Sequence, residues 1–269
     1  MKVFSFLDIL KEIWTNRIRM IRVARFDINI ELRSFYLGTL WKIISPLIQL
    51  GIFWFVFGIG IRGGAPVDDI PFIVWMLAGF VPWIFISRGI SMGANSIRKK
   101  SEILFKIKYP MSTVPVGSIL ICLSDFIVMF CIMAVIYLFN GFFPSLYWLN
   151  LIYYTIFIFV FLSSLALITS VIVQLAADFG NLISSLLQLL FFLTPILWQE
   201  TNVPNWARPF FILNPIRYIV TGFRYSLLYK NNFFERPYLI AFFWGITFLM
   251  LIIGCFLQKK YASRFVDWI

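Results

Sequence analysis

The sequence contains no histidine among its 269 residues. This absence excludes Cys/His zinc sites, Ser-His-Asp triads and histidine proton relays. Its three cysteines, Cys122, Cys131 and Cys255, lie inside apolar runs, so we interpret them as small core residues rather than disulfide partners. No Gly-x-x-x-x-Gly-Lys-Ser/Thr loop is present, and no Gly-Lys pair occurs anywhere. The chain therefore lacks this device for binding ATP phosphates.

Charged side chains are scarce. Only 13% of residues are charged and 61% are hydrophobic, and the mean hydropathy is +0.89. Because a soluble domain carries about 25% charged residues, we expect lipid to be the solvent over most of one membrane domain. The N-terminus has charges but no apolar stretch with a small-residue cleavage site. We therefore expect the first span, not a signal peptide, to direct insertion.

Apolar runs predict an all-α polytopic membrane protein with six transmembrane helices. A helix needs about 20 apolar residues to cross about 30 Å of hydrocarbon. We interpret Arg88 as the residue that closes the second span. The six predicted spans are Ile43–Ile61, Ile70–Ser87, Met111–Phe139, Leu149–Leu175, Gly180–Trp198 and Pro237–Leu257.

The net charge of +11 predicts orientation rather than a nucleic-acid partner. If both termini are cytoplasmic, the cytoplasmic segments hold 16 basic residues and the external loops hold 6. This asymmetry follows the positive-inside rule. We therefore expect a cytoplasmic N-terminal region at 1–42, a transmembrane domain at 43–257 and a cytoplasmic tail at 258–269.

Three segments outside the spans show helical patterns. Residues 5–35 carry two apolar stripes between charged residues, which predicts an amphipathic interfacial helix in the headgroup plane. Asn95–Tyr109 predicts a cytoplasmic helix with Asn95 or Ser96 as its cap. In the connection 199–236, Asn214-Pro215 predicts the start of a helix too short to span the membrane. The apolar stripe of that helix is Ile216, Ile219, Phe223 and Leu227.

Polar groups inside the predicted spans are few. Asp125 is the one acidic residue near mid-membrane, and a proton- or sodium-driven transporter normally needs several such groups. We expect Asp125 to pair with a residue at a span edge or across helices. Gln49, Gln174 and Gln188 are interpreted as contacts between helices. The glycines at 58, 60, 63 and 64 are interpreted as a turn at the outer surface, not a phosphate loop.

Several motifs carry a resemblance to a known family. A Tyr-Leu-Gly…Trp…Pro pattern lies at Tyr36, Leu37, Gly38, Trp41 and Pro46. Further motifs are GIRGGAPVDDIPFIVWMLA at Gly60–Ala78, FFLTPILW at Phe191–Trp198, LNPIRYIVTGFR at Leu213–Arg224 and RFVDWI at Arg264–Ile269. With these motifs the whole chain resembles the permease subunits of ABC-2 type polysaccharide exporters. Within that family it most closely resembles the wall teichoic acid translocation permeases of Gram-positive bacteria.

The resemblance implies a homodimer in the bacterial cytoplasmic membrane, paired with two copies of a separate ABC ATPase. The implied cargo is wall teichoic acid linked to undecaprenyl diphosphate. No catalytic site and no cofactor are expected in this chain, since ATP and Mg²⁺ belong to the partner. The resemblance also implies a cytoplasmic coupling helix after the second span. Two short re-entrant helices are implied between spans five and six.

Candidate site residues fall into groups, each with a structural alternative. For ATPase coupling, or for plain anchoring at the membrane, the residues are Ser96, Arg98, Lys99, Lys100, Glu102, Leu104 and Phe105. For the lipid carrier's diphosphate, or for lipid headgroups, they are Arg17, Arg19, Arg22 and Arg25. For the sugar path, or for lipid contact, they are Tyr36, Trp41, Phe53, Phe57, Trp75, Phe80 and Trp83. Arg217 and Arg224 would meet polymer phosphates or snorkel to the interface.

Other functions stay open on the sequence alone. An O-antigen, capsule or drug exporter of the same superfamily is the nearest rival. A membrane-embedded enzyme of lipid-linked sugar metabolism is a rival of another class. Asp178 and Glu102 do not form the clustered acidic pair that such an enzyme usually has. A pure scaffold is the third alternative.

Overall fold

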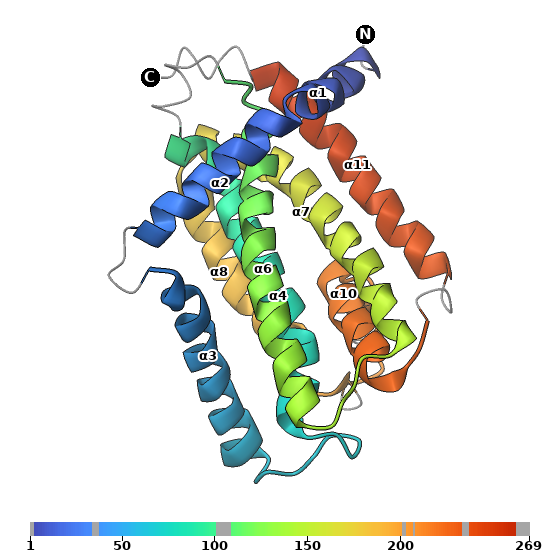
Figure 1. Cartoon of the computed structure of the whole chain (residues 1–269). Helices are drawn as coiled ribbons and strands as arrows, with labels where there is room; N and C mark the ends of the chain where they lie inside the picture. The colour runs from blue at the N-terminus through green and yellow to red at the C-terminus, as the bar shows by residue number, and fades with distance from the viewer. Residues whose placement is uncertain are drawn as a thin grey trace.

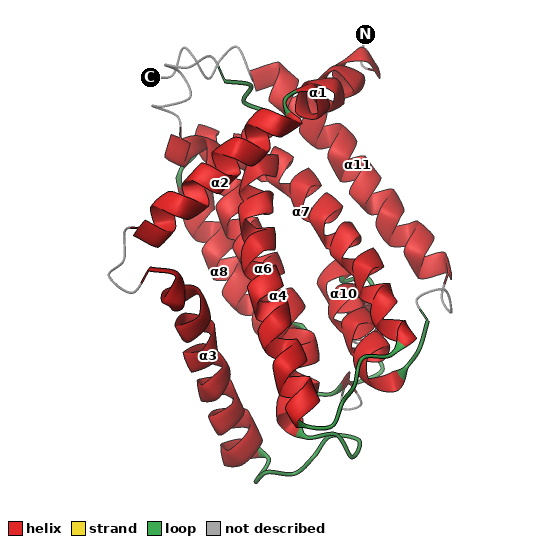
Figure 2. Cartoon of the chain, viewed as in Figure 1, coloured by secondary structure: helices red, strands yellow, loops and turns green. Residues whose placement is uncertain are grey.

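The computed structural model describes residues 3–33, 38–100, 109–200, 203–206, 208–232 and 237–261. Over these ranges the chain is helical, with a single isolated bridge between Val67 and Ile70 and no strand (Figure 2). The long helices run side by side as a bundle (Figure 1). The all-α prediction is therefore confirmed for the described part of the chain.

Five helical segments are long and apolar enough to cross a membrane. They are Trp41–Ile61, formed by α3 (Trp41–Phe53) and the π-helix η2 (Trp54–Ile61); α4 (Phe72–Ala94); α6 (Thr113–Phe139); Leu146–Leu175, formed by the 3₁₀ helix η3 (Leu146–Leu149) and α7 (Asn150–Leu175); and α11 (Pro237–Tyr261). The predicted fifth span corresponds to α8 (Asp178–Leu193), which has only 16 residues. At 1.5 Å per residue α8 is about 24 Å long, shorter than the hydrocarbon core. A sixth span at this segment stays a prediction.

Arg88 does not close the second span, contrary to the sequence prediction. α4 continues past Ser87 and Arg88 to Ala94. Arg88 lies at an ion-pair distance from Asp125 of α6, so it has an anionic partner on a neighbouring helix. A paired charge does not need to end a helix in water.

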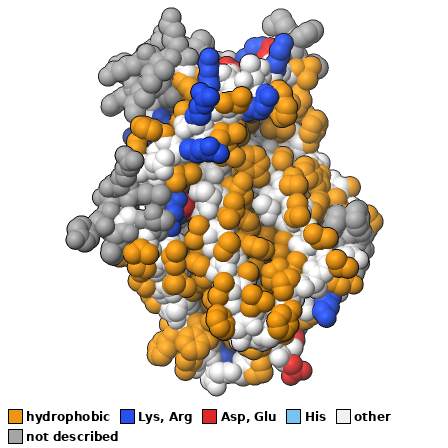
Figure 3. Space-filling view, viewed as in Figure 1, with side chains coloured by type: hydrophobic (Ala, Val, Ile, Leu, Met, Phe, Trp, Pro, Cys, Tyr) orange, Lys and Arg blue, Asp and Glu red, His pale blue; other side chains and the backbone are white. Residues whose placement is uncertain are grey.

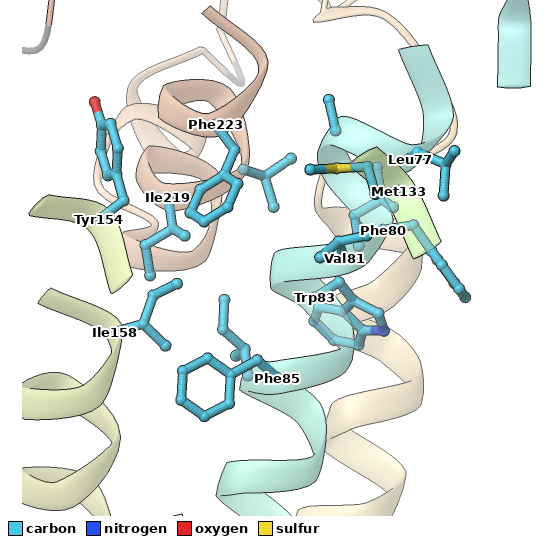
Figure 4. Close-up of a cluster of buried hydrophobic side chains, with 14 of the residues drawn as sticks. Leu77, Phe80, Val81, Trp83, Phe85, Met133, Tyr154, Ile158, Ile219 and Phe223 are labelled. Carbon is cyan, nitrogen blue, oxygen red and sulfur yellow. The ribbon is translucent and has the colours of Figure 1, made fainter. Parts of the chain in front are cut away.

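The hydrophobic core is built around α4. It packs against both α6 and α7, and the short helix α10 (Pro215–Arg224) covers its N-terminal part. In α4, 72% of the most apolar stretch is buried, against 11% in the Trp41–Ile61 span. Figure 4 shows side chains of α4, α7 and α10 meeting in this cluster. The labelled members from these helices include Phe85, Ile158 and Phe223.

The N-terminal region forms two helices instead of the single predicted one. α1 (Val3–Thr15) packs on α11, and α2 (Arg17–Arg33) packs on α6. The side chains of Met20 and Ala24 on α2 are buried, whereas Ile18 and Ile21 are more than 40% exposed. These two members of the predicted stripe face away from the protein, as a helix on a lipid surface requires, whereas the member Ile28 is half-buried. Lys and Arg side chains gather over α1 and α2 in Figure 3. We call this end of the bundle the basic end.

The opposite end holds the connection between α8 and α11. α9 spans Arg208–Ile212, and α10 begins where Asn214-Pro215 predicts it. The side chain of Asn214 accepts a hydrogen bond from the Ile216 backbone N–H at 2.9 Å, and Pro215 occupies the first turn. The predicted stripe Ile216, Ile219, Phe223 and Leu227 is buried. A second π-helix, η5 (Tyr225–Tyr229), follows α10.

Two minor predictions need correction. Cys122 and Cys255 are buried, but Cys131 is exposed on the outside of α6. In the glycine-rich patch only Gly63 and Gly64 form a turn, with positive φ, while Gly58 and Gly60 lie within η2. The turn starts later because η2 keeps helical hydrogen bonding through Ile61.

Small residues bring α4 and α7 into close contact. Gly89 and Gly93 are four residues apart on α4 and face Leu162 and Ala166 of α7. A Cβ atom on Gly93 would lie 2.6 Å from the Cβ of Ala166. Such a spacing of small residues allows membrane helices to approach closely.

We predict that Gly93→Ala destabilises the protein by about 1–3 kcal/mol, because the added methyl group forces α4 and α7 apart. The matched control is Gly245→Ala in α11, where an added Cβ meets no atom within 4 Å. The control is expected to be neutral or slightly stabilising, since alanine favours helix. Thermal unfolding in detergent would measure both variants. Equal stability of the two variants would contradict the close packing.

Candidate functional site

A groove of about 680 Å³ lies between α3 and α4. Its lining combines aromatic, uncharged polar and cationic side chains within a bundle that is otherwise apolar. The lining residues are Gly38, Trp41, Lys42, Ser45, Pro46, Gln49, Trp83, Ile84, Ser87 and Arg88. We treat this groove as the candidate functional site and call it the α3–α4 groove.

Helix periodicity places the polar residues on one wall of the groove. Lys42, Ser45 and Gln49 are three and four residues apart on α3, so they share one face. On α4, Trp83 and Ser87 are likewise four residues apart. These residues line the groove on both helices, and Ser45 and Gln49 are also exposed at its opening.

Asp125 of α6 joins the two walls at one end of the groove. Its Oδ1 accepts a hydrogen bond of 2.7 Å from Lys42 Nζ. Its Oδ2 lies 2.8 Å from Arg88 Nη1, as an ion pair without the alignment of a hydrogen bond. The Asp125 side chain is 7% exposed. The expectation that Asp125 pairs across helices is thus confirmed, and the three groups together carry a charge of +1.

Helix α3 is the loosely held wall of the groove. Leu50 is its one buried residue. At the groove end, Lys42 ties it to α6 through Asp125. Towards its other end the Phe53 ring lies 5.3 Å from the rings of both Phe80 and Phe191. An ion pair and a small aromatic cluster therefore hold this helix, rather than a continuous core.

The predicted sugar-path aromatics separate into two groups. Trp41 and Trp83 line the groove. Phe53 and Phe57 are half-buried at the edge of the core. Trp75 and Phe80 are at most 2% exposed, because neighbouring helices cover both rings, so neither lines the groove. Tyr36 lies outside the described residues.

Arg224 does not face a passing polymer, contrary to one prediction. It is 7% exposed, and its guanidinium lies 3.6 Å from the ring centroid of Trp75. It donates hydrogen bonds of 3.0 Å to the carbonyls of Pro195 and Ile196, just after α8. Burial lowers the pKa of Arg224 to about 10, so the side chain stays charged at neutral pH. Arg224 thereby joins α4, α10 and the segment after α8.

Arg217 is also engaged inside the protein. Its Nε donates a hydrogen bond of 2.8 Å to Glu200, and its Nη2 forms an ion pair with the same carboxylate. Thr221 donates to Glu200 as well. Arg217 nevertheless lines a second, smaller pocket with Tyr218 and Tyr225. Arg217 therefore forms a specific ion pair with Glu200 and does not extend freely to the membrane interface.

The coupling segment is described only up to Lys100. Residues 96–100 are helical, and Glu102, Leu104 and Phe105 lie outside the described residues. The side chain of Ser96 is buried and donates to the Gly93 carbonyl at 2.7 Å. The Asn95 side chain donates back to Ser91. Both therefore bond to the preceding turn of α4, so neither caps the next helix as predicted.

The basic residues of this segment point to different neighbours. Lys99 is exposed, and Lys100 forms an ion pair with Asp27 of α2. Arg98 is exposed and borders a polar pocket together with Asp178 and Asn181 at the start of α8. The structure thus places residues 95–100 in contact with both α2 and the turn before α8.

The four arginines predicted to meet a diphosphate remain on the protein surface. Arg17, Arg19, Arg22 and Arg25 are all exposed on α2. Arg17 donates to the Trp14 carbonyl and lies 4.7 Å from the Trp14 ring centroid. None of the four lines the α3–α4 groove. The groove cations Lys42 and Arg88 were not among the candidate site residues predicted from the sequence. Their positions inside or beside a predicted span could have indicated them, because charged residues in spans are usually functional.

No group of three His, Cys, Asp or Glu residues that would hold a metal ion occurs within the described ranges. Several acidic residues there, such as Asp125, Asp27 and Glu200, are instead paired with bases. The lining of the groove combines cationic side chains with aromatic rings.

Comparison with known proteins identifies the family of this chain. Residues 24–228 match the family described as ABC-2 type transporter. The O-antigen export system permease protein RfbA of Myxococcus xanthus is 24% identical over 240 residues, 87% of this chain and 89% of the relative. RfbA of Klebsiella pneumoniae is 24% identical over 92% of this chain and 93% of its own length. The polysialic acid transport protein KpsM of Escherichia coli is 24% identical over 87% of this chain and 89% of its own length.

We predict that Arg224→Gln destabilises the protein by about 3 kcal/mol, because two buried carbonyls lose a charged donor and the Trp75 ring loses its cation. Arg208→Gln is the matched control, since Arg208 is exposed at the start of α9. Its effect should stay within about 0.5 kcal/mol. Thermal unfolding in lipid nanodiscs would compare them. A midpoint for Arg224→Gln equal to that of Arg208→Gln would contradict the joining role.

Proposed function

Since the chain belongs to the ABC-2 type transporter family, we propose that it is the membrane permease subunit of an ATP-driven polysaccharide exporter. The relatives named above are called O-antigen export permeases and a polysialic acid transport protein, which supports a polysaccharide cargo. The proposal extends to a cargo carried on an isoprenoid diphosphate lipid in a bacterial inner membrane.

The α3–α4 groove carries this proposal. Aromatic rings pack against the C–H faces of sugars, and Trp41 and Trp83 offer two such rings. Ser45, Gln49 and Ser87 add hydrogen-bonding groups for hydroxyls. Lys42 and Arg88 favour anions. A lipid-linked sugar chain combines these three chemistries in one molecule.

The driving force would come from a separate ATPase subunit. The sequence contains no phosphate-binding loop, so ATP hydrolysis needs another polypeptide. We place two copies of that ATPase at the basic end, against the segment that contains Arg98 and Lys99. This places both termini in the cytoplasm, in accord with the charge asymmetry of the loops.

A second copy of this chain would complete the passage. The spans of one chain pack into a filled core, and the groove opens beside the loosely held α3. Apolar side chains on η2 and α8, such as Phe55 and Phe192, are exposed. A homodimer with the passage near its twofold axis would surround a sugar polymer.

The cargo predicted from the sequence resemblance, wall teichoic acid, is not supported by the comparisons. The matched relatives carry the names of O-antigen and polysialic acid transporters, so the alternative fits better. Teichoic acid remains a narrower prediction on the motif Gly60–Ala78 alone. The glycan that accumulates inside cells depleted of the protein would distinguish the two cargoes.

An enzyme of lipid-linked sugar metabolism is the rival of another class. Asp125 and Glu200 are each paired with basic side chains, which disfavours acid–base chemistry by these two carboxylates. Reconstitution with the partner ATPase would test the main proposal. ATP-dependent movement of lipid-linked polysaccharide into proteoliposomes is expected. Glycosyl transfer by the chain alone would contradict it.

For the ATPase, we predict that Lys99→Glu lowers the amount of ATPase that co-purifies with the chain. Lys99 is exposed beside the described end of the coupling segment, and reversal of its charge would repel an acidic docking surface. Lys230→Glu is the control, because Lys230 is exposed at the opposite end of the bundle. Quantitative blotting after affinity purification would measure both. Equal recovery would count against docking by charge.

For the groove, we predict that Trp41→Ala slows export about tenfold, equivalent to roughly 1.4 kcal/mol of lost stacking on the sugar chain. Trp41→Phe should keep most of the rate, since it preserves a ring. Phe139→Ala is the control for an exposed aromatic residue outside the groove. Surface polysaccharide per cell, normalised to the amount of permease, would be measured. A normal rate for Trp41→Ala would remove Trp41 from the path.

A further inference from the structure

A cavity of about 300 Å³ lies against α1 at the basic end of the bundle. Its lining comes from α1, from the turn before α6 and from the end of α11, so three segments far apart in the sequence meet around it. The space corresponds to on the order of ten water molecules, which is enough for a small organic group. The lining residues are Ile9, Glu12, Tyr109, Pro110, Met111, Ser112 and Gln258. We call this space the α1–α11 cavity.

Two polar side chains of the cavity offer hydrogen-bond acceptors and no spare donor. The Ser112 hydroxyl donates to Glu12 Oε2 at 2.5 Å. The amide nitrogen of Gln258 donates to the Leu167 carbonyl at 2.9 Å and to Ser170 at 3.0 Å, which uses both of its hydrogens. Gln258 is 1% exposed, and its Oε1 accepts no hydrogen bond within the described ranges. A buried amide oxygen without a donor is costly, so a donor is missing here.

Glu12 also lacks a cation. Within the described ranges, no Lys or Arg side chain lies at an ion-pair distance from its carboxylate. Asp8, one turn earlier on α1, is by contrast paired with Lys259. Glu12 is half-buried, and the ring of Tyr109 lines the same cavity. A carboxylate, an unsatisfied amide oxygen and an aromatic ring together favour a cation that carries N–H groups.

We propose that the α1–α11 cavity binds a primary ammonium group, supplied by the headgroup of phosphatidylethanolamine in the membrane leaflet at the basic end. An ammonium group has three donors, of which one would meet Glu12 and another Oε1 of Gln258. A metal ion fits less well, because Ca²⁺ takes about six to eight oxygen ligands and Mg²⁺ demands an octahedral set. The site goes beyond the proposed export of polysaccharide and does not depend on it.

The position of the cavity favours a lipid over a soluble amine. Leu7 and Trp14 on α1 are 57% and 69% exposed, as expected for a helix whose outer face lies on lipid. The cavity under this helix is therefore at the depth of the headgroups. The phosphate next to the ammonium is anionic, and the surrounding surface is cationic. Lys259 and Lys260 end α11, and Lys and Arg side chains gather over α1 and α2 (Figure 3).

The bound headgroup would hold α1 against the bundle. One ammonium group would join Glu12 of α1 to Gln258 of α11. A ligand that binds only the folded arrangement stabilises it. Phosphatidylethanolamine is therefore expected to raise the thermal unfolding midpoint of the full chain in detergent, and phosphatidylcholine is not. An equal rise with the two lipids would overturn the proposal.

The first binding experiment uses the unaltered chain. A phosphatidylethanolamine with a fluorescent acyl chain is titrated against the full chain in dodecyl maltoside, and unlabelled lipids compete with it. Successive N-methylation of the headgroup removes N–H donors one at a time and keeps the positive charge. Affinity should fall along the series to phosphatidylcholine, which should bind at least about tenfold more weakly. Equal competition by the first and last lipids of the series would overturn the proposal.

Variants of Glu12 then locate the site. Glu12→Gln should weaken phosphatidylethanolamine binding by about tenfold, whereas Glu12→Asp keeps a carboxylate and should bind within about fivefold of wild type. Asp69→Asn is the matched control, since Asp69 is an exposed carboxylate at the opposite end of the bundle. Unchanged binding by Glu12→Gln, or equal affinity of the two Glu12 variants, would remove Glu12 from the site and overturn the proposal.

A variant that fills the cavity keeps the test decisive if Glu12→Gln does not fold. Met111 is half-buried in the lining, so Met111→Trp takes up part of the space and changes no charge. It should weaken binding by about tenfold. Leu249→Trp is the control, because Leu249 is an exposed apolar residue of α11 outside the cavity. Equal affinity of these two variants would show that the lipid binds elsewhere and overturn the proposal.

Three further outcomes would assign the cavity to another ligand. Free ethanolamine should compete only at far higher concentrations than the lipid, and equal competition would indicate a soluble amine. Mg²⁺ and K⁺ at millimolar concentrations should not displace the labelled lipid, and displacement would indicate a metal site. If Glu12→Gln lowers the amount of co-purified ATPase and leaves lipid binding unchanged, the cavity receives a cation of the partner protein. Each of these three results would overturn the lipid site.

Discussion

The ion-pair cluster of Asp125 with Lys42 and Arg88 is the constraint on which the membrane domain depends. A carboxylate within an apolar helix is tolerated only where cations meet it. Asp125 therefore fixes where α3 and α4 approach α6, and it permits α4 to continue past Arg88. The same three charges place a polar end on a groove that is otherwise lined by rings and hydroxyls.

The rest of the bundle divides into a tightly packed part and a loose part. Small residues bring α4 against α7, and Arg224 ties α10 and the segment after α8 to Trp75 of α4. Tyr229 of η5 is anchored to Asp68, and burial together with this hydrogen bond raises its pKa to about 12, so it stays a donor. Against this rigid part, α3 is held, within the described ranges, by its ion pair with Asp125 and a few rings. Motion is therefore easiest beside the groove.

Some of the site was readable in the sequence, and some was not. The signature that contains Trp41 leads directly to the α3–α4 groove, and the search for mid-membrane charge finds Asp125. The aromatic count alone does not separate Trp83, which lines the groove, from Trp75 and Phe80, which fill the core. Burial of a ring depends on which helices cover it. Sequence periodicity shows which face of a helix is apolar, but it does not show which helix packs against that face.

The sequence by itself determined the helical class, the approximate spans and the start of α10 at Asn214-Pro215, because these follow from local hydropathy and backbone chemistry. Only the tertiary structure decided the partners of the charges. Asp125 meets residues 83 and 37 positions away along the chain, and Arg224 meets carbonyls 28 and 29 positions away. No periodicity encodes contacts at such separations, because they depend on how whole helices pack. The groove and the ion pairs at its end exist only once α3, α4 and α6 are assembled.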